Sequence, residues 1–468
     1  MTLPAPHSGP ESRQSDAETS ELRREVAAQI ETGGVKQVRI ATVDLHGIPR
    51  AKMVTAEEFL GRVVDRGHPW ALPLIAVDIW QNLPEGTGYG EEIGFGNGVL
   101  RPDLRTFRQL PWAPATAHVF ADVFTREGEP APTPRQVLSR VLGRACELGF
   151  TPVFGNELEF YIFRPADESR PSNPGFAPYQ GMQVWFTDQG LGQAQPLLQE
   201  LQEHLLALGI PLYEIFNEHG GGQYEFNLKP LSGIEAIDAV CLMKLAVKEI
   251  CLRRGLRASF LGKISNDPEY PVSGYHLHQS LLDQSGDNVF SDPAAPLGLS
   301  SVGRHYVGGV LEHAMALTAL AAPTVTAYKR FTPGTWAPTR AAWGFDNRTA
   351  MIRVVPGSRG LNLENRLASS DANPYLLAAG MTAAGLEGIR RRSDPGEPGT
   401  GNLLEEKRFP PVPTTLVEAV KAFEEDAFMS EALGESFSRI YVALLRHVWG
   451  RFQSYLTDWE IQEYRELL

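Results

Sequence analysis

Four stretches of the sequence carry chemically active side chains at every second position. In residues 154–163, Glu157, Glu159 and Tyr161 alternate with leucine, phenylalanine and isoleucine, a period typical of a half-buried strand. Carboxylates two residues apart on a strand point to the same face, where their charges repel unless a cation lies between them or one stays protonated. A divalent metal ion would satisfy both carboxylates, so the pattern predicts a metal site.

Three further stretches repeat this alternation of polar and apolar side chains. Ordinary antiparallel strands with one solvated face would explain any one of them. Four stretches that all carry Glu, His or Arg instead favour a single ligand-bearing sheet face, backed by helices on its apolar side. The polar positions of the three stretches are Gln223, Glu225 and Asn227, then His276, His278 and Ser280, and finally Asn362, Glu364 and Arg366.

Glu218, a further candidate metal ligand, precedes Glu225 across a glycine-rich turn. Such a turn can fold Glu218 back beside the strand that carries Glu225. Five carboxylates and one imidazole suit Mg²⁺ or Mn²⁺ better than structural zinc, and so much negative charge requires two metal ions. The candidate metal ligands are Glu157, Glu159, Glu218, Glu225, His276 and Glu364.

Four arginines, Arg330, Arg348, Arg353 and Arg366, flank these strands. Guanidinium groups bind phosphate and carboxylate oxygens through two parallel hydrogen bonds. Any single arginine could instead serve a surface ion pair. Metal ligands together with several arginines indicate phosphoryl transfer.

The elements that must position these side chains fall into two regions. In residues 21–129, a short amphipathic helix and three strands predict a small mixed sheet, and the polar residues 1–20 predict a disordered tail. The proline-rich residues 130–134 mark a boundary, because proline opposes regular pairing and suits the first turn of a helix. Helices then alternate with the ligand-bearing strands over residues 130–468. The three strands are expected at 35–44, 74–79 and 117–124, and the helices at 134–149, 193–208, 234–254, 302–322, 374–391 and beyond 414.

Composition narrows the function classes. The chain has 468 residues and a formal charge of −13, which argues against nucleic acid and anionic membrane surfaces as partners. No stretch of 18 apolar residues and no apolar leader segment is visible, so a cytoplasmic protein is expected. Cys146, Cys241 and Cys251 lack CxxC spacing and are interpreted as reduced core thiols.

Taken together, these stretches resemble the glutamine synthetase family, in the family's order, from about Val35 to Glu460. Residues 156–160 are similar to its paired-glutamate strand, 218–225 to its second glutamate pair, and 273–280 (SGYHLHQS) to its Gly-x-His-x-His segment. Residues 328–334 (YKRFTPG) resemble its flap, 347–353 its phosphate-binding arginines, and 364–366 (ENR) its last metal and substrate pair.

The resemblance implies an α+β fold, with an N-terminal β-grasp domain over residues 21–129 and a C-terminal catalytic domain of antiparallel sheet and helices over 130–468. It also implies a dodecamer of two hexameric rings with active sites between neighbouring subunits. One metal ion would bind Glu159, Glu218 and Glu225, and the other would bind Glu157, His276 and Glu364.

The same resemblance assigns the substrates. Arg330 and Arg366 would hold the amino acid's carboxylates, Arg348 and Arg353 the phosphates of ATP, and His278 with Ser280 the nucleotide. Asp44 and Asp78 would reach the neighbouring subunit's site. Asp44 fits the ammonium-binding position well, whereas Asp78 fits it less well, because Ile79-Trp80 follows where ammonia-using members have Gly-Ser.

Departures from the family pattern concern the substrates. Ammonia-using members carry a glutamate two residues after the flap's Pro-Gly, and this chain has Trp336 there. A tryptophan cannot act as a base. Pro271-Val272 stands where the family has Asn-Gly near the amino acid, and Asn362 replaces an arginine.

The favoured function is therefore an ATP-dependent ligase that makes a γ-glutamyl amide from glutamate and an organic amine through a γ-glutamyl phosphate. Glutamine synthesis from ammonia, and ligation of a different carboxylic acid, are the alternatives. A catalytically dead scaffold is disfavoured, because every metal ligand is present.

Overall fold

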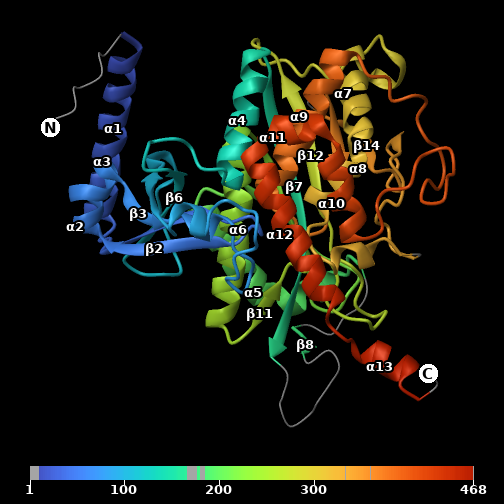
Figure 1. Cartoon of the computed structure of the whole chain (residues 1–468), viewed down its shortest axis with the longest axis horizontal. Coiled ribbons are helices and arrows are strands. Elements are labelled where there is room, and N and C mark those ends of the chain that lie inside the picture. The colour runs from blue at the N-terminus through green and yellow to red at the C-terminus, as the bar shows by residue number, and fades with distance from the viewer. Residues whose placement is uncertain (1–9, 166–175, 180–184, 333, 359, 467–468) are drawn as a thin grey trace. The chain divides into compact units, whose positions relative to one another are not determined.

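The computed structural model describes residues 10–165, 176–179, 185–332, 334–358 and 360–466. The chain forms two compact units (Figure 1). The smaller unit takes in the chain up to Val43 together with Pro49–Leu72 and Gly96–Ala131. The larger unit contains Asp44–Ile48, Pro73–Phe95 and the chain from Pro132 onward. The final boundary thus lies within the predicted proline-rich segment, while two inserted segments of the N-terminal region belong to the larger unit.

The smaller unit is built on a mixed sheet with the strand order β2-β1-β6-β4-β3. Its central pair, β1 and β6, is parallel, and the other neighbours are antiparallel. Val38 and Ile40 of β1 and Val119 of β6 are fully buried, as expected of strands with an apolar face. The elements are α1 (Pro10–Thr32), β1 (Gln37–Val43), β2 (Pro49–Thr55), short helical turns from Ala56 to Arg66, β3 (His68–Ala71), β4 (Asn97–Pro102), β5 (Arg108–Gln109) and β6 (Thr116–Phe124).

Two expectations for this region need correction. Helix α1 begins at Pro10, so residues 10–20 of the expected disordered tail are helical. Proline suits the first turn of a helix, and the glutamate, glutamine and arginine side chains that follow are good helix formers. The strand expected at 74–79 is absent: Leu72–Ile75 forms a 3₁₀ turn followed by a loop. Pro73 lacks the N–H group that a central strand needs.

The larger unit contains the second sheet, whose path through the described residues is β13-β14-β15-β12-β7-β10-β9, with β8 and β11 also paired to β7. All four ligand-bearing stretches form strands of this sheet, as predicted. The strands are β7 (Thr151–Pro165), β8 (Phe176–Pro178), β9 (Leu212–Asn217), β10 (Gln223–Ser232), β11 (Arg257–Ser259), β12 (Tyr275–Leu282), β13 (Trp343–Phe345), β14 (Ile352–Gly357) and β15 (Gly360–Asn365).

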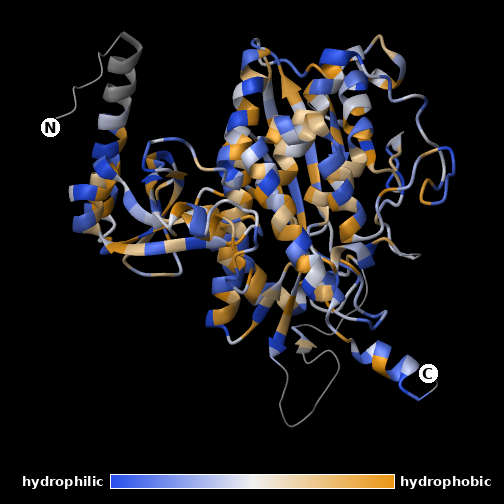
Figure 2. Ribbon diagram, in the orientation of Figure 1, coloured by the Kyte–Doolittle hydropathy of each residue, from blue (hydrophilic) through white to orange (hydrophobic). Residues whose placement is uncertain are grey.

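Helices pack around this sheet, with α9, α11 and α12 seen in front of β7 and β12 in Figure 1. Figure 2 shows hydrophobic and hydrophilic residues alternating along these helices, as expected of helices with one buried face. The helices are α4 (Pro134–Glu147), α5 (Asp188–Ala207), α6 (Gly233–Arg253), α7 (Ser301–Glu312), α8 (Ala314–Ala321), α9 (Pro374–Arg391), α10 (Leu416–Glu425), α11 (Ala427–Leu433), α12 (Glu435–Gln453) and α13 (Asp458–Tyr464).

Two expectations differ here as well. The single helix predicted over 302–322 is two helices, α7 and α8, because His313 leaves helical geometry with φ −98° and ψ 10°. Cys146 is exposed, whereas Cys241 and Cys251 are buried, and all three thiols are free. Within the described part of the chain, no helix has the length and apolar character needed to cross a membrane.

Candidate active site

The four ligand-bearing strands are consecutive neighbours in the larger sheet, in the order β15-β12-β7-β10. Their register places Glu225 opposite Glu159 and His276 opposite Glu157. His278 lies opposite Glu364, which in turn faces Arg353 on β14. Side chains directly opposite each other on a sheet are close enough to share a ligand. Pairing alone therefore gathers the predicted residues on one face.

The first cluster consists of Glu159, Glu218 and Glu225, whose ligand atoms lie within 4.8 Å of one another. The turn between Glu218 and Glu225 depends on glycine, because a Cβ at Gly220 would lie 2.3 Å from the Tyr161 hydroxyl oxygen. Glu159 also accepts a hydrogen bond from the Gly274 N–H at 2.8 Å. Three carboxylates at this separation fit one divalent metal ion.

Burial and mutual repulsion dominate the electrostatics of this cluster. Burial, together with the neighbouring Glu218, raises the pKa of Glu159 to about 8. Burial and the charges of the other carboxylates likewise raise the pKa of Glu225 well above its usual range. Groups held so unfavourably in their charged form are typical of a site that binds a cation.

The second cluster surrounds Glu157. Its carboxylate lies 2.9 Å from Nε2 of His278 and 3.3 Å from Nδ1 of His276. His276 Nδ1 is also 3.8 Å from Glu364. The compact groupings of potential ligands here are Glu157 with Glu225 and His276, and Glu157 with His278 and Glu364. The expected set of Glu157, His276 and Glu364 is therefore gathered in one place, with His278 added to it.

Positive neighbours decide the charge states in this second cluster. Burial opposes ionisation of Glu157, but His278 and His276 outweigh it and hold the pKa of Glu157 well below its usual range. Burial would lower the pKa of His278, yet Glu157 and Glu364 raise it to about 9. His278 Nδ1 is 2.7 Å from Oδ1 of Asn362, the residue that replaces a family arginine. Asn362 thus orients the imidazole ring toward Glu157.

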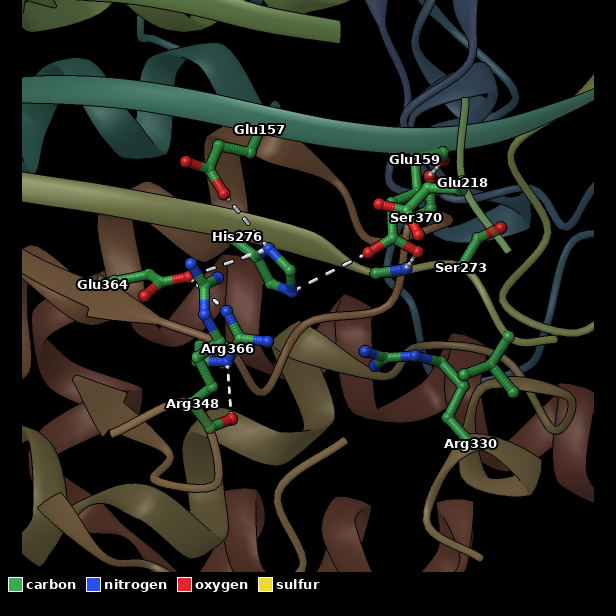
Figure 3. A network of polar contacts seen from close by, with 12 residues as sticks. Glu157, Glu159, Glu218, Ser273, His276, Arg330, Arg348, Glu364, Arg366 and Ser370 are labelled. Carbon is green, nitrogen blue, oxygen red and sulfur yellow. Dashed lines mark hydrogen bonds and ion pairs between the residues drawn. The ribbon is translucent and has the colours of Figure 1, made fainter. Parts of the chain in front are cut away.

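Two arginines border the clusters. Figure 3 shows the guanidinium groups of Arg330 and Arg366 beyond His276, away from Glu157. Arg330 is buried and donates to the Leu367 carbonyl at 3.0 Å. Arg366 bonds Glu364 and, at 3.0 Å, the Arg348 carbonyl. These contacts leave the donor-rich guanidinium of Arg330 facing the carboxylate clusters.

These groups come close together at Gly274. A Cβ at this position would lie 3.1 to 3.3 Å from His276 Nε2, Arg330 Nη2 and Glu159 Oε1. Glycine therefore allows a cation, an imidazole and a carboxylate to converge beside the backbone. A guanidinium next to carboxylates of a metal-type cluster is suited to binding the carboxylate of a small acid.

The other phosphate-type arginines differ in their surroundings. Arg353 bonds Glu364 at 2.9 Å and Asp346 at 2.6 Å, and burial is outweighed by these carboxylates, which raise its pKa. The Arg348 side chain is exposed. Ser280 is half-buried, two residues beyond His278 and opposite Val153, so it lies on the same face farther along β12.

The two aspartates of the inserted segments are both buried. One Asp44 oxygen accepts the N–H groups of His46 and Ile48, at 3.0 and 2.9 Å. The Asp44 carbonyl accepts the Asn373 side-chain amide at 2.9 Å. The turn that carries Asp44 is thus attached to the start of α9.

Asp78 has several contacts within its own chain. One oxygen accepts the N–H groups of Trp80 and Asn82, each at 2.8 Å, and the other bonds the Asn82 amide and Arg451. His447 also lies 3.3 Å away. Asp78 is fully buried, so these contacts anchor its loop.

Trp336, which stands at the position of the family's flap glutamate, is 54% exposed and contacts Trp185, with 6.1 Å between ring centroids. The sequence interpretation missed Trp185. It lies in no alternating stretch of ligand-type residues, and its only signal was the aromatic pair Trp185-Phe186. It is a hydrogen-bonding neighbour that lowers the pKa of Glu218, against the larger effect of burial, so it borders the first carboxylate cluster.

Comparison with known proteins settles the family. The profile of the glutamine synthetase catalytic domain matches residues 131–464. The chain belongs to the glutamine synthetase family. Its enzyme class is therefore that of this family, the ATP-dependent carbon–nitrogen ligases.

Individual relatives of this glutamine synthetase family member span nearly its whole length. Gamma-glutamylethanolamide synthetase of Streptomyces coelicolor is 34% identical over 442 residues, covering 94% of each chain. Gamma-glutamylanilide synthase of an Acinetobacter species is 32% identical over 479 residues, covering 95% of each chain. The solved structure of GmaS in complex with ADP has a TM-score of 0.83 and 30% identity, covering 94% of this chain and 99% of the other.

A first prediction for this glutamine synthetase family site concerns pH. Without metal, the thermal midpoint should fall as pH rises from about 6.5 to 8. In this window folded Glu159 and His278, with pKa values of about 8 and 9, keep protons that the unfolded chain has released. Each such proton costs up to about 1.4 kcal/mol of stability per pH unit. Burial and Arg366 lower the pKa of His276. This shift changes the stability only at pH values below this window.

Thermal melts in EDTA and in excess Mg²⁺ test this expectation. Because metal binding requires deprotonated carboxylates, the difference between the two midpoints should widen with pH. A metal-free midpoint that stays level across the window would contradict the assigned charge states.

Proposed function

We propose that the protein forms a γ-glutamyl amide from ATP, glutamate and an organic amine, releasing ADP and phosphate. The observation that carries the choice of amine is Trp336, an indole where an ammonia-using site has a carboxylate. The names of the relatives from Streptomyces coelicolor and Acinetobacter, which specify an ethanolamide and an anilide, support the same choice. The substrates are thus three small molecules.

The residues divide the work as follows. Arg330 and Arg366 hold the carboxylates of glutamate, and Arg348 and Arg353 hold phosphate oxygens, while His278 and Ser280 border the nucleotide. Two divalent ions, Mg²⁺ or Mn²⁺, would be held by the two carboxylate clusters and supply charge neutralisation at the phosphates.

The proposed reaction proceeds in two steps. An oxygen of the glutamate side chain bonds to the γ-phosphorus as the bond to ADP breaks, which gives an acyl phosphate. The amine nitrogen then bonds to the acyl carbon, phosphate leaves, and the amine's extra proton passes to Asp44 or to water. The arginines orient both carboxylates throughout.

Glutamine synthesis from ammonia remains the second candidate, because the family itself is named for that reaction. Ammonium is small and strongly hydrated, so its site needs an anionic lining and a base, and Trp336 offers neither. A different acid in place of glutamate is the third, since Pro271 and Val272 depart from the family pattern. The intact carboxylate clusters argue against a dead scaffold.

Phosphate release in the presence of ATP, Mg²⁺ and glutamate, measured with ammonia and a panel of primary amines, tests the proposal. We expect at least one amine to exceed ammonia in kcat/KM. Preference for ammonia over every amine would replace the proposal with glutamine synthesis, and replacing glutamate with other acids tests the third candidate.

The variant Trp336→Glu provides the next prediction. It restores the acid of ammonia-using sites, so use of ammonia should rise and use of the preferred amine should fall by about tenfold, the loss expected when one to two methylenes lose their contact and a cation–π contact disappears. Trp336→Phe is the matched control, because it keeps an aromatic ring and should keep the preference for amine. If Trp336→Glu leaves the ratio of amine to ammonia turnover unchanged, Trp336 only anchors the flap.

We further propose a cytoplasmic dodecamer of two hexameric rings in which Asp44 completes a neighbouring subunit's site. The family resemblance supports this arrangement, and complementation tests it. Asp44→Ala and Arg353→Ala should each be inactive, while unfolding and co-assembling them should restore about a quarter of wild-type activity, the share of sites with two intact halves. Mixed oligomers without any rescue would contradict sites shared between subunits.

A further inference from the structure

Two indole rings stand beside the first carboxylate cluster without being part of a core. Trp185 is 44% exposed and Trp336 is 54% exposed. Their planes make an angle of 74° at a centroid separation of 6.1 Å. Large aromatic rings left half in water next to a polar site indicate a binding surface rather than a packing role.

Neighbouring residues fix the positions of both tryptophans, beginning with Trp185. Phe186, next to Trp185, takes a left-handed φ of 52° and donates its N–H to the Asn217 carbonyl at 3.3 Å. Its ring packs on Phe216 at 4.9 Å. A non-glycine residue in this conformation must be stabilised by its surroundings. The strained backbone therefore fixes the position of Trp185 immediately before α5.

The flap side has its own anchor. Thr335 donates its hydroxyl to the Thr332 carbonyl at 2.9 Å and to the carbonyl of Arg330. Arg330 is buried beside the carboxylate clusters. Trp336 is thus tied to the same residue that would hold glutamate.

Trp185 also reaches the metal-type cluster directly. It is a hydrogen-bonding neighbour that lowers the pKa of Glu218, against the larger effect of burial, and its ring lies 4.6 Å from the His219 ring. Trp185 therefore lies beside the first carboxylate cluster and meets Trp336 in an edge-to-face contact. An amine at this place would have its nitrogen near the cluster and its substituent against the two indoles.

We infer that Trp185 and Trp336 form an aromatic clamp for the substituent of the amine, and that the substrate class is primary monoamines with an apolar arm of two or more carbons. The inference rests on the proposed function and specifies its substrate. An apolar arm gains with every methylene that leaves water, whereas the second ammonium of a diamine gains only a weak contact at exposed ring faces. The monoamine is therefore favoured over a diamine of equal length.

The experiment compares kcat/KM for methylamine, ethylamine, propylamine, butylamine and 1,4-diaminobutane. In the wild type, kcat/KM should rise about three- to fourfold per methylene, and butylamine should exceed the diamine. In Trp185→Ala the rise should flatten, while the KM values for ATP and glutamate stay within about twofold of the wild type. Trp185→Phe should keep the rise, because it loses only the hydrogen bond to Glu218.

The control is Trp459→Ala, which removes an indole that is 62% exposed on α13 and should keep the wild-type rise. Calorimetric titration of butylamine into wild type and Trp185→Ala, with Mg²⁺ and ADP present, gives a readout that does not depend on turnover. The inference is overturned if Trp185→Ala keeps the rise or binds butylamine as the wild type does, or if the diamine is preferred. If ammonia exceeds every amine and butylamine fails to bind, the proposed function itself fails.

Discussion

Glu225→Gln should lower kcat by at least about a thousandfold with Mg²⁺ and saturating substrates. The amide keeps the shape of Glu225 but removes one negative charge from the cluster with Glu159 and Glu218. Without this charged ligand the metal ion is bound weakly at the place where it must neutralise phosphate charge. The activation free energy should therefore rise by about 4 kcal/mol. Phosphate release measures the rate, and titration with Mn²⁺ measures the affinity for metal.

The matched control is Glu203→Gln on the exposed face of α5, which changes the net charge equally. It should behave as the wild type. Since the raised pKa of Glu225 reflects burial and its acidic neighbours, Glu225→Gln should also melt no lower than the wild type in EDTA. Near-normal turnover in the folded variant would disprove the assignment of Glu225 as a metal ligand.

Arg330→Lys should raise the KM for glutamate about 10- to 100-fold with a small change in the KM for ATP. Arg330 is buried, and one of its amino groups is occupied by the Leu367 carbonyl. Its other terminal nitrogen, Nη2, lies beside Gly274, close to His276 and Glu159. Lysine keeps the charge but loses the planar pair of donors, which costs about 1.5 to 3 kcal/mol for a charged partner.

Initial-rate kinetics with glutamate and ATP varied separately check this expectation. Arg254→Lys, which alters an exposed ion pair with Glu200 on the helix surface, serves as the control. Burial lowers the pKa of Arg330 to about 10, so its guanidinium still carries its charge at neutral pH. An equal rise in the KM for both substrates would indicate a general disturbance of the site.

The sequence predicted the catalytic sheet well, because its strands have a strict period of two with one apolar face. Glu157, Glu159, His276 and Glu364 lie on the expected strands, and the order of those strands brings them together. Prediction was poorer where local pattern and tertiary context disagree. The apolar run at 74–79 looked like a strand, but Pro73 and the buried carboxylate of Asp78 make it a turn and a loop.

Parts of the candidate site could not be predicted for a related reason. Trp185 belongs to the candidate site because it lies just before α5 and contacts Trp336. No periodic pattern in the sequence indicates either feature. Arg353 was recognised as flanking the site, but the short strand β14 that places it opposite Glu364 was not. Contacts between residues far apart in sequence need the strand pairing that only the fold supplies.

The order of the four ligand-bearing strands also bears on how the protein folds. Glu157 and Glu364, both in the second cluster, are about 200 residues apart in sequence, yet only β12 lies between their strands. Such distant segments meet late, because closing long loops costs entropy before any contact is gained. Their carboxylates then repel each other only once the chain is nearly native. A divalent ion at the second cluster therefore has no complete binding site in the early chain, and we expect it to slow unfolding rather than to speed folding.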